Sequence, residues 1–220
     1  MTDPRSRLIG VLLLTSLVAM MTGAVIVVPS GLTLNPSDPA ATLAAVGEQA
    51  GLHLTELAFD VLGWLALTTA GLAMTARPAG PVAGGPVAGG LLAAAGLAGL
   101  LHDAGNLALT QLAAVPAAVP AAASAALAVM LTAKWLVNLA GLLWVAATVA
   151  AASGVPMPAR LRVAGLVAAL SGLAAVALPW TTGTAGPTVA LEQLGYVLHL
   201  PIMLWYGVLG LRFLRLRLGR

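Results

Sequence analysis

The chain has no cysteine and very few charged residues. Of its 220 residues, 8% are charged and 60% are hydrophobic, whereas a soluble domain carries roughly a quarter charged residues. So few charges cannot cover the surface of a water-soluble globule, and lipid is therefore the expected solvent. The lack of cysteine excludes disulfides, thiolate metal ligands and cysteine nucleophiles.

Several functional motifs are also missing. The chain has no P-loop, no G-x-S-x-G elbow, and no G-x-G-x-x-G following a strand. The net charge is +3, but the basic residues lie in short connections and at the two ends. We therefore expect no nucleotide binding, no serine hydrolase activity and no nucleic-acid partner.

What the chain has is six long apolar segments, at residues 8–29, 51–75, 90–112, 123–151, 161–180 and 189–211. A membrane span needs ~20 residues, and backbone amides inside lipid need internal partners, which favours helices. Proline and glycine separate the segments. Two separators are tandem repeats, GPVAG over 80–89 and AAVP over 113–120, which we interpret as linkers. The sequence predicts an all-α polytopic membrane protein with a single transmembrane domain, residues 1–220.

The first segment resembles a signal peptide only superficially. Its apolar run from Leu8 to Val28 is longer than the 7–15 residues of a signal-peptide core, so we expect a retained helix. In a six-span topology every arginine falls on one side of the membrane, which the positive-inside rule assigns to the cytoplasm. Both termini are then cytoplasmic, and the basic C-terminus also attracts anionic membrane lipid. These arginines are Arg5, Arg7, Arg77, Arg160, Arg162, Arg212, Arg215, Arg217 and Arg220.

Ionisable residues inside the apolar segments need an explanation, because each costs about 2.5–3.5 kcal/mol near the bilayer centre. Helical spacing places them on shared faces within four of the segments. These faces carry His53, Glu56 and Asp60 in 51–75; Asp103 and Asn106, with His102 beside them, in 90–112; Lys134 and Asn138 in 123–151; and Glu192, Tyr196 and His199 in 189–211.

Counting rise along each segment brings several of these groups to one height in the membrane. At 1.5 Å per residue, Asp60, Asp103 and Lys134 lie within roughly 5 Å of the midplane, and so do His102 and His199. We therefore predict a polar cavity among the second, third, fourth and sixth segments, open towards the outer face. Asp103 or Asp60 is the expected partner of Lys134.

The leading functional hypothesis is an intramembrane enzyme doing acid–base chemistry, of isomerisation or cyclisation type, on a lipophilic small molecule. If one acid of the cavity stays protonated, the site holds both an acid and a base. The candidate catalytic residues are Asp60, Asp103, Lys134, His199 and Glu56. The candidate substrate-binding residues are His102, Asn106, Asn138, Glu192, Tyr196, Trp64, Trp135 and Trp205.

Three alternatives stay open. The same groups could relay protons in a proton-coupled transporter, although residues 1–110 and 111–220 show no inverted repeat. His102 and His199 could ligate a haem or a metal, but no metal-binding motif is present and the sequence requires no cofactor. Finally, side chains such as Asn106 and Asn138 could simply join helices through hydrogen bonds.

Five stretches carry a resemblance to known proteins: RLIGVLLL, SDPAATLAAV, FDVLG, SGVPMPARLRVAGLVAALSGLA and YVLHLPIMLWYGVLGLRFL. In these stretches the chain resembles small bacterial six-helix integral membrane proteins that are grouped only as a domain of unknown function. The resemblance implies a six-helix fold and no particular activity. Together with the alanine-, glycine- and arginine-rich composition, typical of GC-rich bacteria, it predicts a bacterial inner-membrane location.

Overall fold

Seven α-helices and one 3₁₀ helix make up the described structure. The computed structural model describes residues 3–76, 84–115, 120–186 and 188–215, and these ranges contain no strand. The long helices are α1 (Pro4–Ser30), α3 (Ala50–Thr75), α4 (Gly84–Ala113), α5 (Pro120–Gly154), α6 (Ala159–Ala177) and α7 (Val189–Arg215). Six helices are long and apolar enough to cross a membrane. These observations confirm the prediction of an all-α membrane protein with six helices able to span the bilayer.

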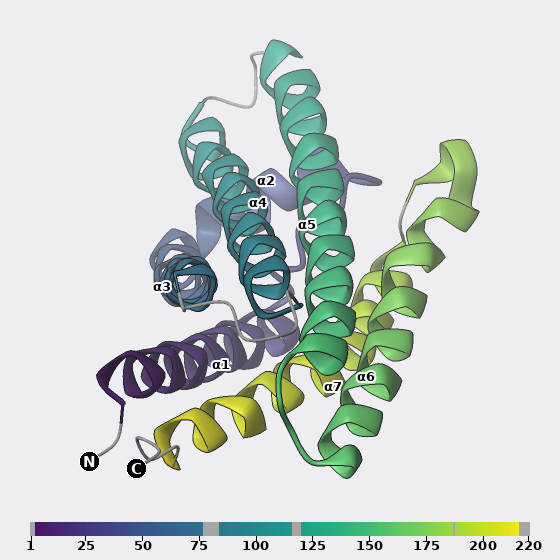
Figure 1. The fold of residues 1–220 in the computed structure, drawn as a ribbon. Coiled ribbons are helices and arrows are strands. Elements are labelled where there is room, and N and C mark those ends of the chain that lie inside the picture. Colours follow the sequence, from purple (N-terminus) through teal and green to yellow (C-terminus); the bar gives the residue numbers. More distant parts are fainter. Residues whose placement is uncertain (1–2, 77–83, 116–119, 187, 216–220) are drawn as a thin grey trace.

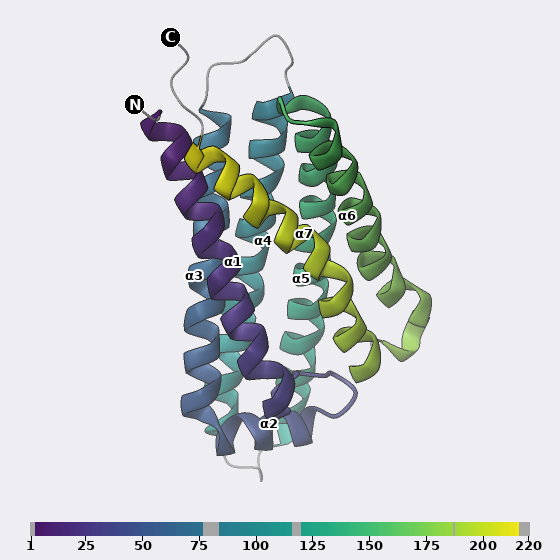
Figure 2. The ribbon, with the colours of Figure 1, turned by 90° about the horizontal axis from the view of Figure 1, so that it is seen from below.

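The long helices form a closed ring. Following the ring, α1, α3, α4, α5, α6 and α7 each pack against the next, and α7 packs back against α1 (Figure 1). Both ends of the described chain lie at one end of the bundle, with the turn between α5 and α6, while α2 (Pro39–Glu48) crosses the opposite end (Figure 2). Because the ring is closed, α3, α4, α5 and α7 all face the same interior space.

The outer surface of the ring is apolar. Val18, Val25 and Leu170 are 64%, 68% and 67% exposed, and many other leucines and valines are more than 40% exposed. A contiguous apolar surface of this extent would drive aggregation in water, whereas acyl chains solvate it without penalty. The distribution of exposed side chains therefore agrees with a multi-pass membrane protein.

Glycines allow the helices to approach closely where the ring is tightest. A Cβ on Gly71 of α3 would lie 2.6 Å from Gly89 O of α4, and closer still to the backbone of Ala93. A Cβ on Gly10 of α1 would lie 2.7 Å from Gly210 O of α7. Small residues at crossings are the usual means by which membrane helices gain van der Waals contact. These two contacts hold α3 against α4, and α1 against α7.

The connections differ from the predicted linkers in three places. α2 occupies part of the expected first loop, because Asp38 accepts a hydrogen bond from Ala41 N and Pro39 occupies the first helical position. The second GPVAG copy is helical, since α4 already begins at Gly84. The remainder of that linker, residues 80–83, and residues 116–119 of the AAVP repeat lie outside the described residues, as does Arg77. The fifth predicted helix ends at Ala177 and continues as the 3₁₀ helix η1 (Leu178–Ala185).

α7 contains a proline in its interior. Pro201 has no amide hydrogen and interrupts the helical ladder. In the same turn, Ser171 Oγ of α6 donates a hydrogen bond to Leu198 O at 2.8 Å. Neighbouring hydroxyls commonly stabilise interrupted helices in this way inside membranes.

We expect Gly71→Ala to destabilise the protein by about 1–3 kcal/mol, because the added methyl group overpacks the α3–α4 crossing. Gly51→Ala, on the same helix, is the matched control, since nothing lies within 4 Å of its Cβ position. Unfolding in detergent with rising dodecyl sulfate, followed by tryptophan fluorescence, measures both free energies. Equal stability of the two variants would contradict the close α3–α4 contact.

Candidate functional site

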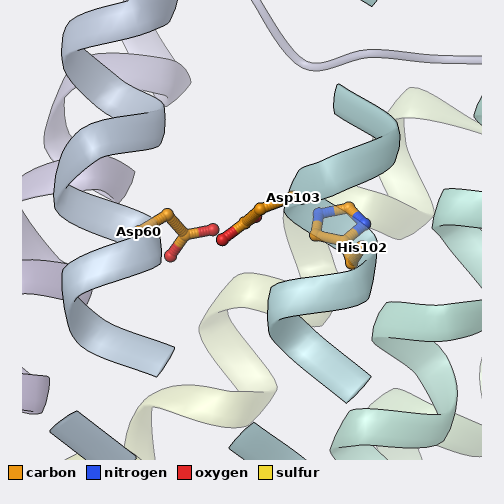
Figure 3. Close-up of side chains that lie close together, drawn as sticks. All are labelled: Asp60, His102 and Asp103. Atoms are coloured by element: carbon orange, nitrogen blue, oxygen red, sulfur yellow. The ribbon is translucent and has the colours of Figure 1, made fainter. Parts of the chain in front are cut away.

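A cavity of about 230 Å³ lies inside the helix ring. Its wall includes the predicted site residues Glu56, Asp60, Trp64, His102, Asn106, Lys134, Trp135, Asn138, Glu192, Tyr196 and His199. Asp103 is fully buried and is not part of this wall, but it faces Asp60, which is (Figure 3). Of the thirteen predicted site residues only Trp205 lies elsewhere: its indole donates to Leu161 O at 2.8 Å.

On α3, helical spacing turns His53, Glu56 and Asp60 towards the ring interior. His53 is 1% exposed and its Nε2 donates to Asn106 O at 3.3 Å. Its Nδ1 lies 3.7 Å from Glu56 Oε2. The imidazole therefore joins α3 to α4 and leaves its second nitrogen beside a carboxyl group.

On α4, two hydrogen bonds define the tautomer of His102. Its Nδ1 lies 2.8 Å from Ala133 O, a carbonyl that can only accept, so Nδ1 carries the proton. Its Nε2 lies 3.0 Å from Asn106 Nδ2 and accepts from that amide. His102 is thus held as a neutral imidazole that joins α4 to α5.

Asp60 of α3 and Asp103 of α4 form the central feature of the site. Their carboxyl groups point at one another across the helix interface (Figure 3) and interact directly. Asp103 is fully buried, and neither of its oxygens has a hydrogen-bond donor among the described residues. Two carboxylates that face one another directly repel strongly when both are charged. The pair therefore needs either a shared proton or a cation.

Lys134 forms an ion pair across the cavity. Its Nζ lies 2.8 Å from Glu192 Oε1, so α5 and α7 meet through this contact although they are not neighbours in the ring. The predicted pairing with Asp103 or Asp60 is wrong. Counting rise along the helices compares backbone heights only, whereas the long lysine side chain reaches Glu192 on another helix.

His199 and Tyr196 bring α7 to the same cavity. His199 Nδ1 donates to Gly195 O at 3.1 Å within its own helix. Its Nε2 is buried without a described hydrogen-bond partner, beside Gly141 of α5. This tautomer leaves Nε2 with a lone pair beside Gly141, another residue of the cavity wall.

Asn138 has a structural role as well as a place on the cavity wall. Its amide donates to Val176 O at 3.0 Å, and Trp180 Nε1 donates to its Oδ1 at 2.9 Å. Trp180 also packs edge-on against Trp135, with ring centroids 5.3 Å apart. Trp180 was not predicted as part of the site, because it lies at the end of an apolar segment and no spacing relates it to Asn138.

The apolar side of the cavity comes largely from α1, which contributes Met20, Ala24 and Val27, and from Leu32 and Leu34 after it. The sequence could not predict that these residues line the cavity, because α1 has no face of polar residues that would show which side points inward. Trp64 and Trp144 add aromatic surface, with ring centroids 5.7 Å apart. The site is therefore amphiphilic, because polar groups from α3, α4, α5 and α7 share the wall with these apolar side chains.

One group in the described residues has metal-ligand spacing. Asp60, His102 and Asp103 each offer one ligand atom, and these atoms lie within 4.8 Å of one another. However, both ring nitrogens of His102 are engaged in hydrogen bonds, so a metal would have to displace Ala133 or Asn106. The same hydrogen bonds disfavour His102 as a haem ligand. A proton shared between the two carboxyl groups requires no such displacement.

We expect Lys134→Met and Glu192→Gln each to destabilise the protein by about 3–5 kcal/mol, because each leaves one buried charge without its partner. The double variant should recover most of this loss. The four free energies of unfolding, measured in detergent as a double-mutant cycle, give the coupling energy. Additive losses would contradict the Lys134–Glu192 pair.

Comparisons of the chain with protein-family models, with curated proteins and with solved structures each found no match. The resemblance to small six-helix bacterial proteins therefore stays a prediction. Function is inferred from the cavity and from the carboxyl groups that face it.

Proposed function

We propose that this chain is an integral membrane enzyme that moves protons to and from a lipophilic small molecule bound in the cavity. The observation that carries the proposal is the facing pair Asp60–Asp103 at the wall of a mainly apolar cavity. A pair that shares one proton contains a general acid and a general base in contact. The reaction class that needs both is isomerisation or cyclisation, in which one carbon gains a proton and another loses one.

The proposed reaction needs no cofactor, because one proton is donated to the substrate and one is taken back. Asp60, which lines the cavity, donates the shared proton to the substrate, and the resulting charge develops on the substrate. The carboxylate then removes a proton from a different carbon, which restores the pair. The apolar wall from α1 keeps water from capturing the charged intermediate. His199, with a free Nε2 on the cavity, is the second group able to carry the departing proton.

The Lys134–Glu192 ion pair lies on the same cavity wall and joins α5 to α7 there. Lys134 also interacts electrostatically with His102. Hydrogen bonds to Ala133 O and from Asn106 hold His102 as a neutral imidazole, so it positions rather than protonates. The hydrogen bond from His102 to Ala133 O fixes α4 against α5 next to the carboxyl pair.

A second candidate function is proton-coupled transport. His53, Glu56 and Asp60 follow one another along a single face of α3, from its first turns towards its middle. Such a series resembles a relay that brings protons from one membrane face to the carboxyl pair. Proton flux in proteoliposomes without any chemical change of the bound molecule would favour this function over an enzyme.

We also propose that the protein resides in a bacterial inner membrane with both termini in the cytoplasm. The arginine-bearing ends of α1, α6 and α7 share one end of the bundle (Figure 2), which supports this orientation through the positive-inside rule. Arg5 and Arg212 also donate hydrogen bonds there, to Ala76 O and Pro156 O.

Deuterium uptake tests the proposed chemistry without knowledge of the substrate. We expect the purified protein, incubated in deuterium oxide with liposomes of host-membrane lipid extract, to introduce deuterium into one lipophilic species at carbon. Asp60→Asn and Asp103→Asn should each reduce this exchange at least 100-fold, the lower end of the contribution of a general acid or base. Mass spectrometry of the extracted lipids measures it.

Asp38→Asn is the matched control for these variants. Asp38 caps α2 outside the cavity, and asparagine can still accept the hydrogen bond from Ala41 N. It should exchange deuterium at the wild-type rate. Undiminished exchange in Asp103→Asn would reject the carboxyl pair as the catalytic group.

The absence of native cysteine makes the orientation directly testable. Ser37→Cys, in the exposed loop before α2, should react with a membrane-impermeant maleimide in intact cells. Ser153→Cys, exposed near the end of α5, should react only after the membrane is permeabilised. The reverse pattern would contradict the proposed orientation.

A further inference from the structure

The cavity carries more negative than positive groups. Glu56, Asp60 and Asp103 interact electrostatically with one another, and Glu192 also reaches the cavity. Among the described residues of the cavity wall, Lys134 is the only lysine or arginine. It already forms an ion pair with Glu192. Three carboxyl groups are therefore left without a lysine or arginine partner inside a membrane-spanning bundle.

The histidines nearby do not neutralise this excess fully. His53 can pair with Glu56, at 3.7 Å, but His102 is held as a neutral imidazole by Ala133 O and Asn106. His199 is engaged through Nδ1 with its own helix. The Asp103 carboxyl group, which faces Asp60, thus keeps two buried oxygens without a donor among the described residues. Buried polar groups of this kind indicate a missing partner.

The rest of the cavity suits an apolar cation. Trp64, Trp135, Trp144 and Tyr196 all contribute to its wall. The faces of aromatic rings attract cations, and aliphatic side chains such as Met20 and Val27 solvate a hydrocarbon body. Anionic ligands are disfavoured because they would meet Glu56 and Asp60, which reach the wall without a lysine or arginine partner among the described residues.

We propose that the cavity selects lipophilic cations, meaning hydrocarbon molecules with a quaternary ammonium group or with a positive charge formed by protonation. The inference deepens the proposed function and rests on it: the substrate of the carboxyl pair either carries a positive charge or acquires one during the reaction. The Asp60–Asp103 pair neutralises that charge, and the aromatic wall surrounds it.

Two isosteric probes separate charge from shape. Phenyltrimethylammonium and tert-butylbenzene differ only in a nitrogen cation replacing a carbon atom. Equilibrium dialysis of the wild-type protein in nanodiscs of zwitterionic lipid, corrected with empty nanodiscs, measures both affinities. We expect the ammonium probe to bind at least tenfold more tightly than its neutral isostere.

Variants assign that preference to the carboxyl pair. Asp60→Asn and Asp103→Asn should each weaken phenyltrimethylammonium binding about tenfold and leave tert-butylbenzene binding unchanged. Asp38→Asn, outside the cavity, should change neither affinity.

A glycine on the cavity wall tests the location. A Cβ on Gly195 would meet nothing within 4 Å, so Gly195→Leu can extend into the cavity without displacing a neighbour. It should weaken both probes. Gly51→Leu, equally open but away from the cavity wall, is its control.

The outcomes distinguish this inference from the proposed function. Equal affinity for both probes, with loss of both in Gly195→Leu, would overturn the cation preference and leave a lipophilic cavity. No binding of either probe to the wild-type protein would overturn both. A cation preference that persists in Asp60→Asn and Asp103→Asn would overturn the assignment to the carboxyl pair.

Discussion

A carboxyl group buried in a membrane-spanning helix must meet a proton, a cation or a donor, and the interior of this protein follows from that constraint. Asp103 is completely buried, and Asp60 faces it from the neighbouring helix. Neither faces lipid, because Asp103 is enclosed between helices and Asp60 lies on the cavity wall. The energetic cost of charge in hydrocarbon thus converts two separate polar positions into one site.

Backbone contacts position that site. Gly99 of α4, one turn before Asp103, leaves room for Trp64 of α3, one turn after Asp60, so the two helices lie close where the carboxyl groups face one another. His53 and His102 then tie α3 to α4 and α4 to α5 through carbonyl oxygens, so the helix ring is stabilised by the same imidazoles that surround the carboxyl pair. α1 supplies apolar surface and completes the cavity wall.

The sequence predicted most of the polar wall, because helical spacing and the apolar background make each ionisable residue stand out. It also predicted the number of helices able to span a membrane, since Pro29–Gly31 and similar breaks separate long apolar runs. Three features escaped prediction for physical reasons. The Lys134–Glu192 pair depends on side-chain reach rather than backbone height. The apolar cavity wall from α1 has no polar residues at helical spacing that could have indicated it. The contact between Trp180 and Asn138 depends on the 3₁₀ path of η1. The N-cap of α2 at Asp38, followed by Pro39, was a signal that could have been recognised.

Infrared spectroscopy of protein labelled with ¹³C-aspartate tests the central claim most directly, because it detects the C=O stretch of a protonated carboxyl group. If Asp60 and Asp103 share one proton, the wild-type protein shows this band at neutral pH. Both Asp60→Asn and Asp103→Asn should shift or remove the band, while Asp38→Asn should leave it unchanged. A wild-type spectrum without the band, or a band that one of the two cavity variants leaves unaltered, would contradict a shared proton.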